Sequence, residues 1–285
     1  MLKHYLLIVC SLHCIFSNYF CSFPCGREHT VCYRERCILS YDCGRSGKTL
    51  RLGKGDKEWI LHLHNTHRNR IALGEDSTGG NGKASNMHTL SYNRELEFVA
   101  QCWSDACRGG GKIHDSCRIT KKFDRVGQNT YTSEPGDNKD FRGRHFLTAA
   151  VKSWYSGINL SDANIINSYK DAANSVRYFT QLMWAETTHV GCGRTAYSPK
   201  YQFYAVYIYC NYGIGGNIVS APVYKRGAPC SECTNSTCNG NYAGLCGRME
   251  DLSEDTWINP FGSSAPKLKM AFSKIVIVTI LLVFI

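Results

Sequence analysis

Sixteen cysteines in a chain of 285 residues constrain the fold of this protein more than any other feature. Cysteines in such number stay paired only in an oxidising compartment, unless they bind metal in tight clusters. With 43% hydrophobic residues and no glycine period, the chain also has enough apolar material to form a core. The sequence therefore predicts a disulfide-stapled extracellular protein, with one sizeable domain and smaller appendages.

The N-terminus has the pattern of a secretory signal peptide. Lys3 and His4 precede an apolar stretch at residues 5–16, which ends near Ser17. This stretch is shorter than the roughly 20 apolar residues that span a bilayer. We expect residues 1–17 to be removed together with Cys10 and Cys14, which leaves an even number of cysteines for pairing.

The C-terminus has the pattern of a glycosylphosphatidylinositol (GPI) attachment signal. Small residues at 262–265 precede a spacer at 266–274 and an apolar tail at 275–285. We expect the lipid at Ser263 or Ser264, on the outer membrane leaflet, and removal of residues 265–285. A frayed end, or a weak membrane tail held by Lys274, remains as an alternative.

Charge gives little indication of a partner. The two removable segments contain four lysines and no acidic residue, so processing lowers the net charge from +10 to +6. Such a modest surplus is typical of a solvated surface. We expect no nucleic-acid partner in an extracellular compartment.

Cysteine clusters and periodic segments divide the chain. We expect a Cys-rich segment at 18–55, a main domain at 56–219, a second Cys-rich segment at 220–247 and a linker at 248–264. The last cluster favours two local disulfides over a zinc site, with three pairings open. Its members are Cys230, Cys233, Cys238 and Cys246.

The main domain shows an ordinary α+β pattern. Apolar periodicity predicts helices from a cap at Asp56 to Gly74, from Leu96 to the glycines at 109–111, around 146–154 and around 178–183. Residues 189–197 and 202–212 predict an antiparallel hairpin that places Cys192 opposite Cys210. The glycosylation sequons at Asn159 and Asn235 indicate surface positions.

Five ordered motifs resemble one protein family. They are His64-Asn65-x-x-Arg68, Val126-Gly127-Gln128-Asn129, Phe179-Thr180-Gln181-Leu182-Met183-Trp184, Val190-Gly191-Cys192-Gly193 and Tyr209-Cys210-Asn211-Tyr212. Together they resemble the CAP superfamily (cysteine-rich secretory proteins, antigen 5 and pathogenesis-related proteins), and in particular the antigen-5 branch of arthropod venom and saliva proteins. The resemblance implies an α-β-α sandwich, with a small antiparallel sheet between helical layers, followed by a Cys-rich extension.

The resemblance also implies a set of disulfides. It suggests the bridges Cys21–Cys32, Cys25–Cys117, Cys43–Cys107 and Cys192–Cys210. Cys37 and Cys102 are extra to the family pattern, and we infer that they pair with each other because Cys43 and Cys107 already tether the same two segments.

Many members of the family hold a divalent metal in a cleft with two histidines and two acidic residues. The matching positions here are His114, Gln128, Gly157 and Tyr178. Only the first retains a metal-ligating side chain of the family type, and a zinc or copper site needs three or four donors. We therefore expect neither a metal nor another cofactor.

Other catalytic patterns are also missing. The sequence has no Gly-x-Ser-x-Gly element, and every mature cysteine has an expected partner. His62, His64 and His67 invite a metal interpretation, but on a helix His62 and His64 point about 200° apart. We expect a protein that is not an enzyme.

Two binding hypotheses follow. Relatives in this branch can hold sterols or fatty acids, and an apolar stretch here suits such a ligand, although the same spacing describes a core-facing helix. Its members are Phe179, Leu182, Met183 and Trp184. The rival is a protein-interaction module that acts in adhesion, immunity or haemostasis through its loops. Lys54-Gly55-Asp56 resembles an integrin-recognition tripeptide, a match too short to carry weight alone.

Overall fold

The computed structural model describes residues 19–108, 113–136, 140–200 and 203–253. The expected signal peptide, the anchor positions Ser263 and Ser264 and the apolar tail lie outside these residues. Within the described part, no helix combines the length and apolar character needed to cross a bilayer.

A small sheet lies at the centre of the fold. Strands β4 (His189–Lys200) and β5 (Phe203–Gly213) form the expected antiparallel hairpin, and Cys192 lies opposite Cys210 and is bonded to it. Strand β3 (Val126–Thr132) adds to β5 in antiparallel orientation. The two-residue strands β1 (Lys48–Thr49) and β2 (Ser91–Tyr92) pair with β4, antiparallel and parallel respectively.

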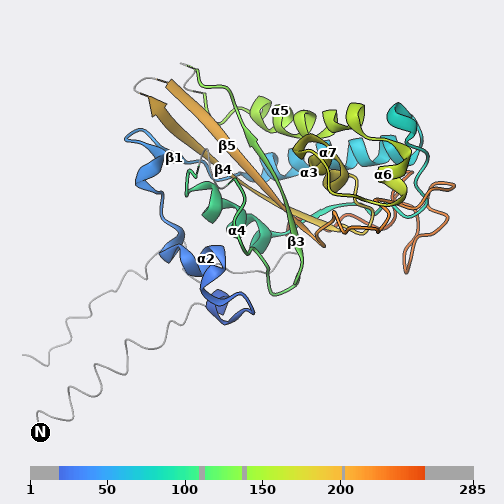
Figure 1. Cartoon of the computed structure of the whole chain (residues 1–285), viewed down its shortest axis with the longest axis horizontal. Coiled ribbons are helices and arrows are strands. Elements are labelled where there is room, and N and C mark those ends of the chain that lie inside the picture. The colour runs from blue at the N-terminus through green and yellow to red at the C-terminus, as the bar shows by residue number, and fades with distance from the viewer. Residues whose placement is uncertain (1–18, 109–112, 137–139, 201–202, 254–285) are drawn as a thin grey trace, which may run out of the picture.

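Helices cover both faces of this sheet (Figure 1). On one face lie α3 (Lys54–Ala72), α5 (Arg144–Tyr155), α7 (Asn174–Leu182) and the short α6 (Ala163–Asn167). On the other lie α4 (Arg94–Ser104) and the short α2 (Thr30–Tyr33). Successive side chains of β5 point to opposite faces of the sheet, so this strand contacts both helical layers. Ile208 packs into the larger core with α3, α5 and α7, whereas Tyr207 and Tyr209 pack against α4. The α-β-α sandwich is confirmed.

Two glycines allow α4 to lie directly on the sheet. A Cβ at Gly191 would lie 2.3 Å from the Glu97 nitrogen, and one at Gly193 would lie 2.4 Å from the Gln101 backbone. Any larger residue would push the helix away from β4. The family motif around Cys192 therefore has a packing reason.

Two helix boundaries differ from expectation. Helix α3 begins at Lys54 with Gly53 as its N-cap, and Asp56 acts from inside the first turn by accepting a 3.3 Å hydrogen bond from the Gly53 N–H. Helix α4 ends at Ser104, well before the glycines at 109–111. There the Asp105 carboxylate accepts hydrogen bonds from Thr195 (2.7 Å) and Thr49 (3.0 Å), which fixes the chain against the sheet.

Four disulfides involve the N-terminal segment, and three of them hold it against the body of the fold. One is local, and three reach forward by 64 to 92 residues. These are the pairs that the resemblance and our inference gave: Cys21–Cys32, Cys25–Cys117, Cys37–Cys102 and Cys43–Cys107. The segment is therefore part of the rigid molecule.

The Cys37–Cys102 bridge, which is extra to the family pattern, gives a direct prediction. Replacing both cysteines by serine should lower the free energy of unfolding by about 2–4 kcal/mol, because the bridge restricts the unfolded chain. Denaturant unfolding of the secreted protein measures this loss. Peptide mapping of the non-reduced protein should recover the linked pair, and recovery of Cys37 and Cys102 as free thiols would contradict the pairing.

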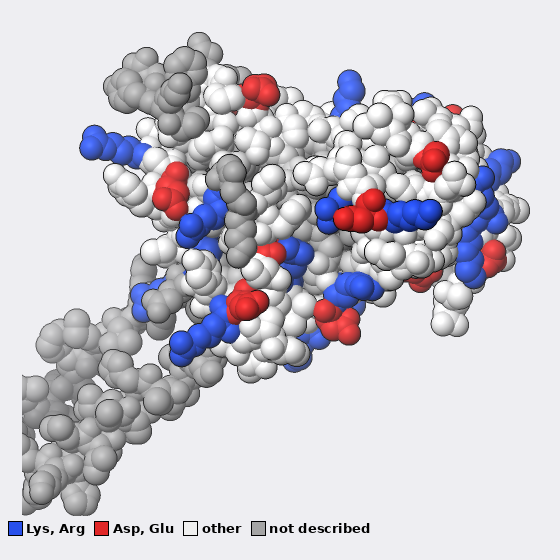
Figure 2. All heavy atoms as spheres, in the orientation of Figure 1, with Lys and Arg blue, Asp and Glu red and all other residues white. Residues whose placement is uncertain are grey.

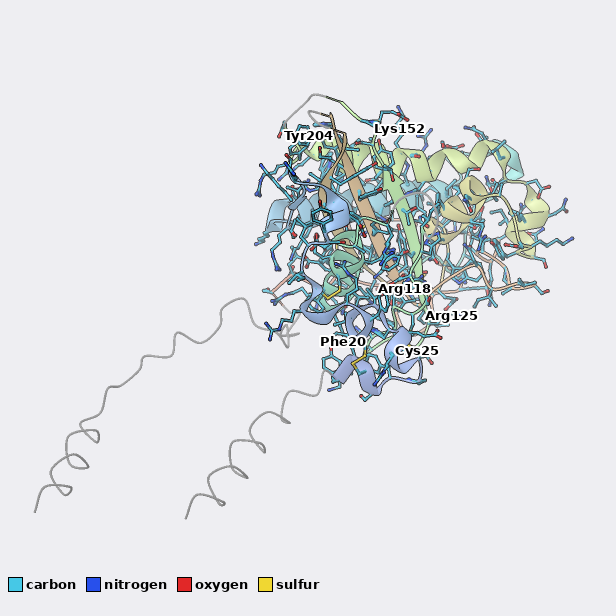
Figure 3. The ribbon with its side chains drawn as sticks, turned by 60° about the vertical axis from the view of Figure 1, so that its left-hand side comes forward. Phe20, Cys25, Arg118, Arg125, Lys152 and Tyr204 are labelled. Carbon is cyan, nitrogen blue, oxygen red and sulfur yellow. A yellow bond between two sulfur atoms is a disulfide. The ribbon has the colours of Figure 1, made fainter. Side chains whose placement is uncertain are left out.

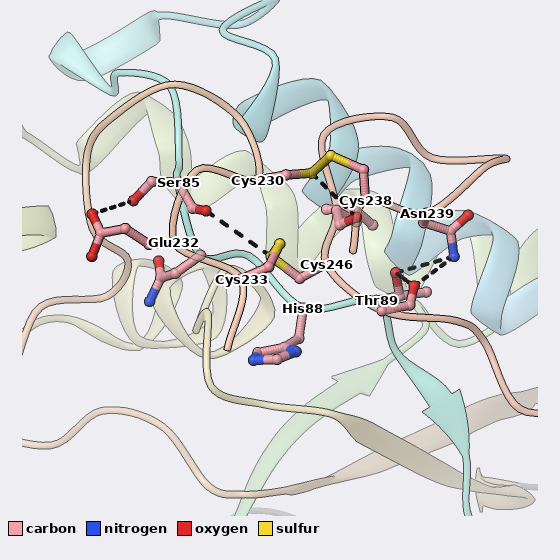
Figure 4. The surroundings of a disulfide bond; sticks show 12 residues. Ser85, His88, Thr89, Cys230, Glu232, Cys233, Cys238, Asn239 and Cys246 are labelled. Carbon is pink, nitrogen blue, oxygen red and sulfur yellow. Dashed lines mark hydrogen bonds between the residues drawn. A yellow bond between two sulfur atoms is a disulfide. The ribbon is translucent and has the colours of Figure 1, made fainter. Parts of the chain in front are cut away.

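The C-terminal Cys-rich segment docks on the loop before β2 (Figure 4). Its bridges are Cys230–Cys238 and Cys233–Cys246, which select one of the three possible pairings. The Cys246 N–H donates to the Met87 carbonyl at 2.7 Å. The sulfurs of Cys230, Cys233 and Cys246 lie within 4.8 Å of one another. Because all three belong to cystines, they do not supply the thiolates that zinc requires.

Candidate functional site

A polar cleft of about 350 Å³ lies where β3 meets the outer face of α7. Three of the four residues that match the family's metal positions line it: His114, Gln128 and Tyr178. Gly157 does not line it. This glycine is buried behind α7, where a Cβ would lie 2.0 Å from the Ser175 carbonyl oxygen, so no side chain fits at this position.

The amide of Gln128 is fully used inside the protein. Its Oε1 accepts a 2.8 Å hydrogen bond from His114 Nδ1, and its Nε2 donates to Asp115 Oδ1 at 3.1 Å and to Asn211 Oδ1 at 3.0 Å. Because both neighbours of Nε2 are acceptors, the position requires a donor, and a carboxylate would be repelled. Glutamine thus stabilises the bottom of the cleft.

His114 and Tyr178 are also held in place. Burial lowers the pKa of His114 below its usual value, so at neutral pH the ring is uncharged and its Nδ1–H points at Gln128. The Tyr178 hydroxyl shares a 2.9 Å hydrogen bond with Thr130 Oγ1, and its ring centre lies 6.3 Å from that of His114.

These contacts do not fit a metal ion. Of the four family positions, only His114 keeps a side chain of the usual metal-ligating kind, with its Nε2 lone pair unengaged, and Tyr178 offers only a neutral phenol. Gln128 is satisfied by protein groups and Gly157 has no side chain. A stable zinc or copper site needs three or four donors.

We expect the purified protein, after dialysis, to contain no stoichiometric zinc or copper. Elemental analysis by plasma mass spectrometry checks this directly, with a His114→Ala variant as the matched control. One equivalent of metal that disappears in the variant would show that the cleft holds an ion.

The cleft carries three arginines that the sequence analysis did not identify. Arg118 and Arg125 lie at the start of β3 (Figure 3), and Arg177 lies on α7. On α7, Asn174, Arg177, Tyr178 and Gln181 follow the i, i+3, i+4, i+7 pattern and therefore share one face. That spacing is the sequence signal that could have revealed this face.

The residues proposed to contact a lipid lie on the opposite side of α7 and in the turn after it. Their side chains are buried in the main core, and none lines the polar cleft: Phe179, Leu182, Met183 and Trp184. The helical period separates Phe179 and Leu182 from the cleft-facing Tyr178. In this conformation the apolar stretch forms core and does not form a groove.

The three histidines of α3 do not converge. His64 is buried, donates from Nδ1 to the Ile60 carbonyl at 2.8 Å and accepts from the Tyr212 hydroxyl at Nε2 (3.0 Å). Burial lowers its pKa to about 3, so it packs as a neutral ring. His67 instead stacks on Tyr155, with ring centres 4.0 Å apart.

The tripeptide Lys54-Gly55-Asp56 is not presented on a loop. It forms the first turn of α3, and the Asp56 carboxylate lies 3.3 Å from Arg194 Nη2. An integrin ligand needs an accessible aspartate, so this placement does not support the integrin interpretation.

Together these features define a disulfide-stapled α-β-α sandwich with a polar cleft at one end of its sheet. The family model described as "Cysteine-rich secretory protein family" (CAP) matches residues 61–212. Venom allergen 5 of Microctonus hyperodae is 36% identical over 204 residues, which cover 70% of this chain and 83% of that protein. The chain therefore belongs to the CAP family and is of the venom-allergen kind.

Solved structures agree with this assignment. BmVAL-1 has a TM-score of 0.58 at 26% identity, over 70% of this chain and 97% of that one. A second relative, solved with Zn²⁺, has a TM-score of 0.56 at 25% identity, over 69% of this chain and 97% of that one.

Proposed function

We propose that this protein is secreted and acts by binding a ligand, without catalysing a reaction. The observation that carries the proposal is the cleft itself, where only one of the family's four metal positions, His114, keeps its usual metal-ligating side chain. A Gln128 amide satisfied by His114, Asp115 and Asn211 leaves neither a metal-activated water nor a general base of the family type.

Two ligand classes follow from the sequence, and the geometry favours the second. A sterol or fatty acid needs an apolar groove, but the candidate side chains on and after α7 are core residues. An extracellular protein partner needs a rigid exposed surface, and the disulfide-bonded N-terminal segment provides one. It exposes Tyr33, Ile38 and Tyr41, of which Tyr41 is 90% exposed. We therefore place recognition of an extracellular protein ahead of lipid carriage.

A lipid titration tests the preference for a protein partner over a lipid ligand. The secreted, delipidated protein is titrated separately with a fluorescent sterol and a fluorescent fatty acid, each with an unlabelled competitor. We expect no saturable binding of either. Saturable, competed binding at about one ligand per chain would restore the lipid-carrier hypothesis, because it requires a specific apolar site.

The second part of the proposal is location at the cell surface through a GPI anchor at Ser263 or Ser264. Cleavage by phosphatidylinositol-specific phospholipase C should release the protein from expressing cells into the medium. A chain that ends at residue 262 should be secreted without the enzyme. Retention on cells after cleavage would contradict the anchor. Asn159 and Asn235 are exposed, as glycan acceptors must be, and glycosidase treatment should lower the apparent mass.

A further inference from the structure

The cleft has the charge of an anion-binding site. Its lining includes Arg118, Arg125, Arg177 and the neutral His114, and no aspartate or glutamate lies among the lining residues. Over the face shown in Figure 2 as a whole, basic and acidic side chains are interspersed. A concave site lined by one sign of charge concentrates the electrostatic potential. The family's two acidic positions hold the neutral Gln128 and Gly157 here, so the arginines set the sign of the charge in the cleft.

The three arginines differ in what they have left to offer a ligand. Arg118 is held by Asp115: its Nε lies 2.5 Å from Oδ1, and its Nη1 donates to the Val126 carbonyl at 3.1 Å. Arg118 is therefore fixed in position at the side of the cleft, and Asp115 largely neutralises its charge.

Arg125 and Arg177 retain free donors. Arg125 is exposed, and within the described residues its guanidinium has no ion-pair or hydrogen-bond partner. Arg177 lies 3.7 Å from Asp171 and also makes a side-chain hydrogen bond with Tyr169, which together leave part of its five N–H donors unused. Because the Arg177 and Asp171 side chains are both exposed, their ion pair contributes little. The two guanidinium groups are therefore available to bind an anion.

The geometry points to a cleft that binds the sulfate or carboxylate groups of an anionic oligosaccharide through Arg125 and Arg177. This inference goes beyond the proposed function, because it gives the cleft a ligand class separate from the N-terminal surface. The guanidinium fork matches these oxyanions in a bidentate manner. Asn174 and Tyr178 share the α7 face with Arg177 and add an amide and a phenol, which suit a ligand rich in hydroxyl groups more than an acyl chain.

The test compares two double variants of equal charge. Arg125→Gln/Arg177→Gln removes the cleft arginines, and Arg27→Gln/Arg51→Gln removes two exposed arginines outside the cleft. The full chain, expressed through the secretory pathway, is titrated calorimetrically with a heparin hexasaccharide at about 0.15 M salt, where distant charges are screened. All four substitutions are at exposed positions, so thermal unfolding should be unchanged.

We expect the cleft variant to bind at least about 10-fold more weakly, because charge-assisted hydrogen bonds are lost, and the control to stay within about 2-fold. Equal weakening in both variants would show that general surface charge is responsible and overturn the inference. Absence of binding by the unsubstituted protein would also overturn it, while leaving the proposed function intact. Stoichiometric metal at His114 with metal-dependent turnover would overturn both.

An unsulfated heparosan hexasaccharide separates the two anion sources. If heparosan binds as tightly as heparin, and its binding depends on Arg125 and Arg177, the cleft recognises carboxylates. Binding seen only with heparin, with the same dependence, assigns it to sulfates, and either result supports the inference.

Discussion

Replacing Arg68 by methionine is expected to lower the free energy of unfolding by about 3–5 kcal/mol. Arg68 is fully buried on α3, and its guanidinium donates hydrogen bonds to five backbone carbonyls at 2.7–3.3 Å. The acceptors lie in the loop before β2 and in the turn after α7: His88, Leu182, Trp184, Ala185 and Thr187. Methionine fills similar space but removes these donors, and within the described part of the chain only the Trp184 and Ala185 carbonyls keep a backbone N–H partner outside the helices and strands.

Burial lowers the pKa of Arg68 to about 9, which still leaves the side chain cationic at neutral pH. Arg68→Lys keeps the positive charge but lacks the planar guanidinium. We therefore expect it to lower the free energy of unfolding by less than Arg68→Met does. The matched control is Arg70→Met on the same helix. Arg70 is half exposed, and its ion pair with Asp76 is long at 3.8 Å. Replacing Arg70 should therefore lower the free energy of unfolding by no more than about 1 kcal/mol. Denaturant unfolding gives all three values. Equal stabilities for Arg68→Met and Arg70→Met would contradict the structural role of the buried guanidinium.

Replacing Phe179 by alanine is expected to cost about 3–5 kcal/mol of stability, because it opens a cavity in the main core. The ring is fully buried on α7 and packs edge-on against Tyr155, with ring centres 5.8 Å apart. Behind it, Gly157 leaves no spare room, so the helix cannot shift freely to refill the space.

The control for Phe179 is its neighbour on the cleft face. Tyr178→Phe removes only the hydrogen bond to Thr130 and should cost about 0.5–1.5 kcal/mol. Thermal and denaturant unfolding measure both variants. If Phe179→Ala kept full stability but lost the capacity to bind a sterol or fatty acid, Phe179 would be a ligand contact and the lipid hypothesis would regain first place.

The sequence predicts the larger elements because their signals are strong and local. The β4–β5 hairpin combines β-branched and aromatic residues with a cysteine on each strand, and α5 shows helical periodicity. Strands β1 and β2, with two residues each, are too short to carry any pattern. The early end of α4 depends on the bonds of Asp105 to Thr49 and Thr195, which are distant in sequence and therefore invisible to local rules.

The candidate site was predictable only in part. His114, Gln128 and Tyr178 were found through the family motifs, and they meet in the cleft. Arg125 and Arg177 were missed because an isolated arginine in a sequence is usually a solvated surface residue. The spacing of Phe179, Leu182, Met183 and Trp184 fits both a lipid contact and a core-facing helix, so the sequence alone left the two open. The structure buries these four side chains and places the neighbouring Tyr178 in the cleft.

Three disulfides of the N-terminal segment cannot form until the ribosome has synthesised their second cysteine. The partners of Cys37 and Cys43 lie 65 and 64 residues further along the chain, and that of Cys25 lies 92 residues further. At about 5–20 residues per second, the ribosome needs roughly 3–18 s to supply those partners. During that interval, until Cys102 is synthesised, Cys25, Cys37 and Cys43 have only one another, Cys21 and Cys32 as available partners. Non-native cystines formed then must be exchanged later, so efficient production of this protein depends on a disulfide isomerase.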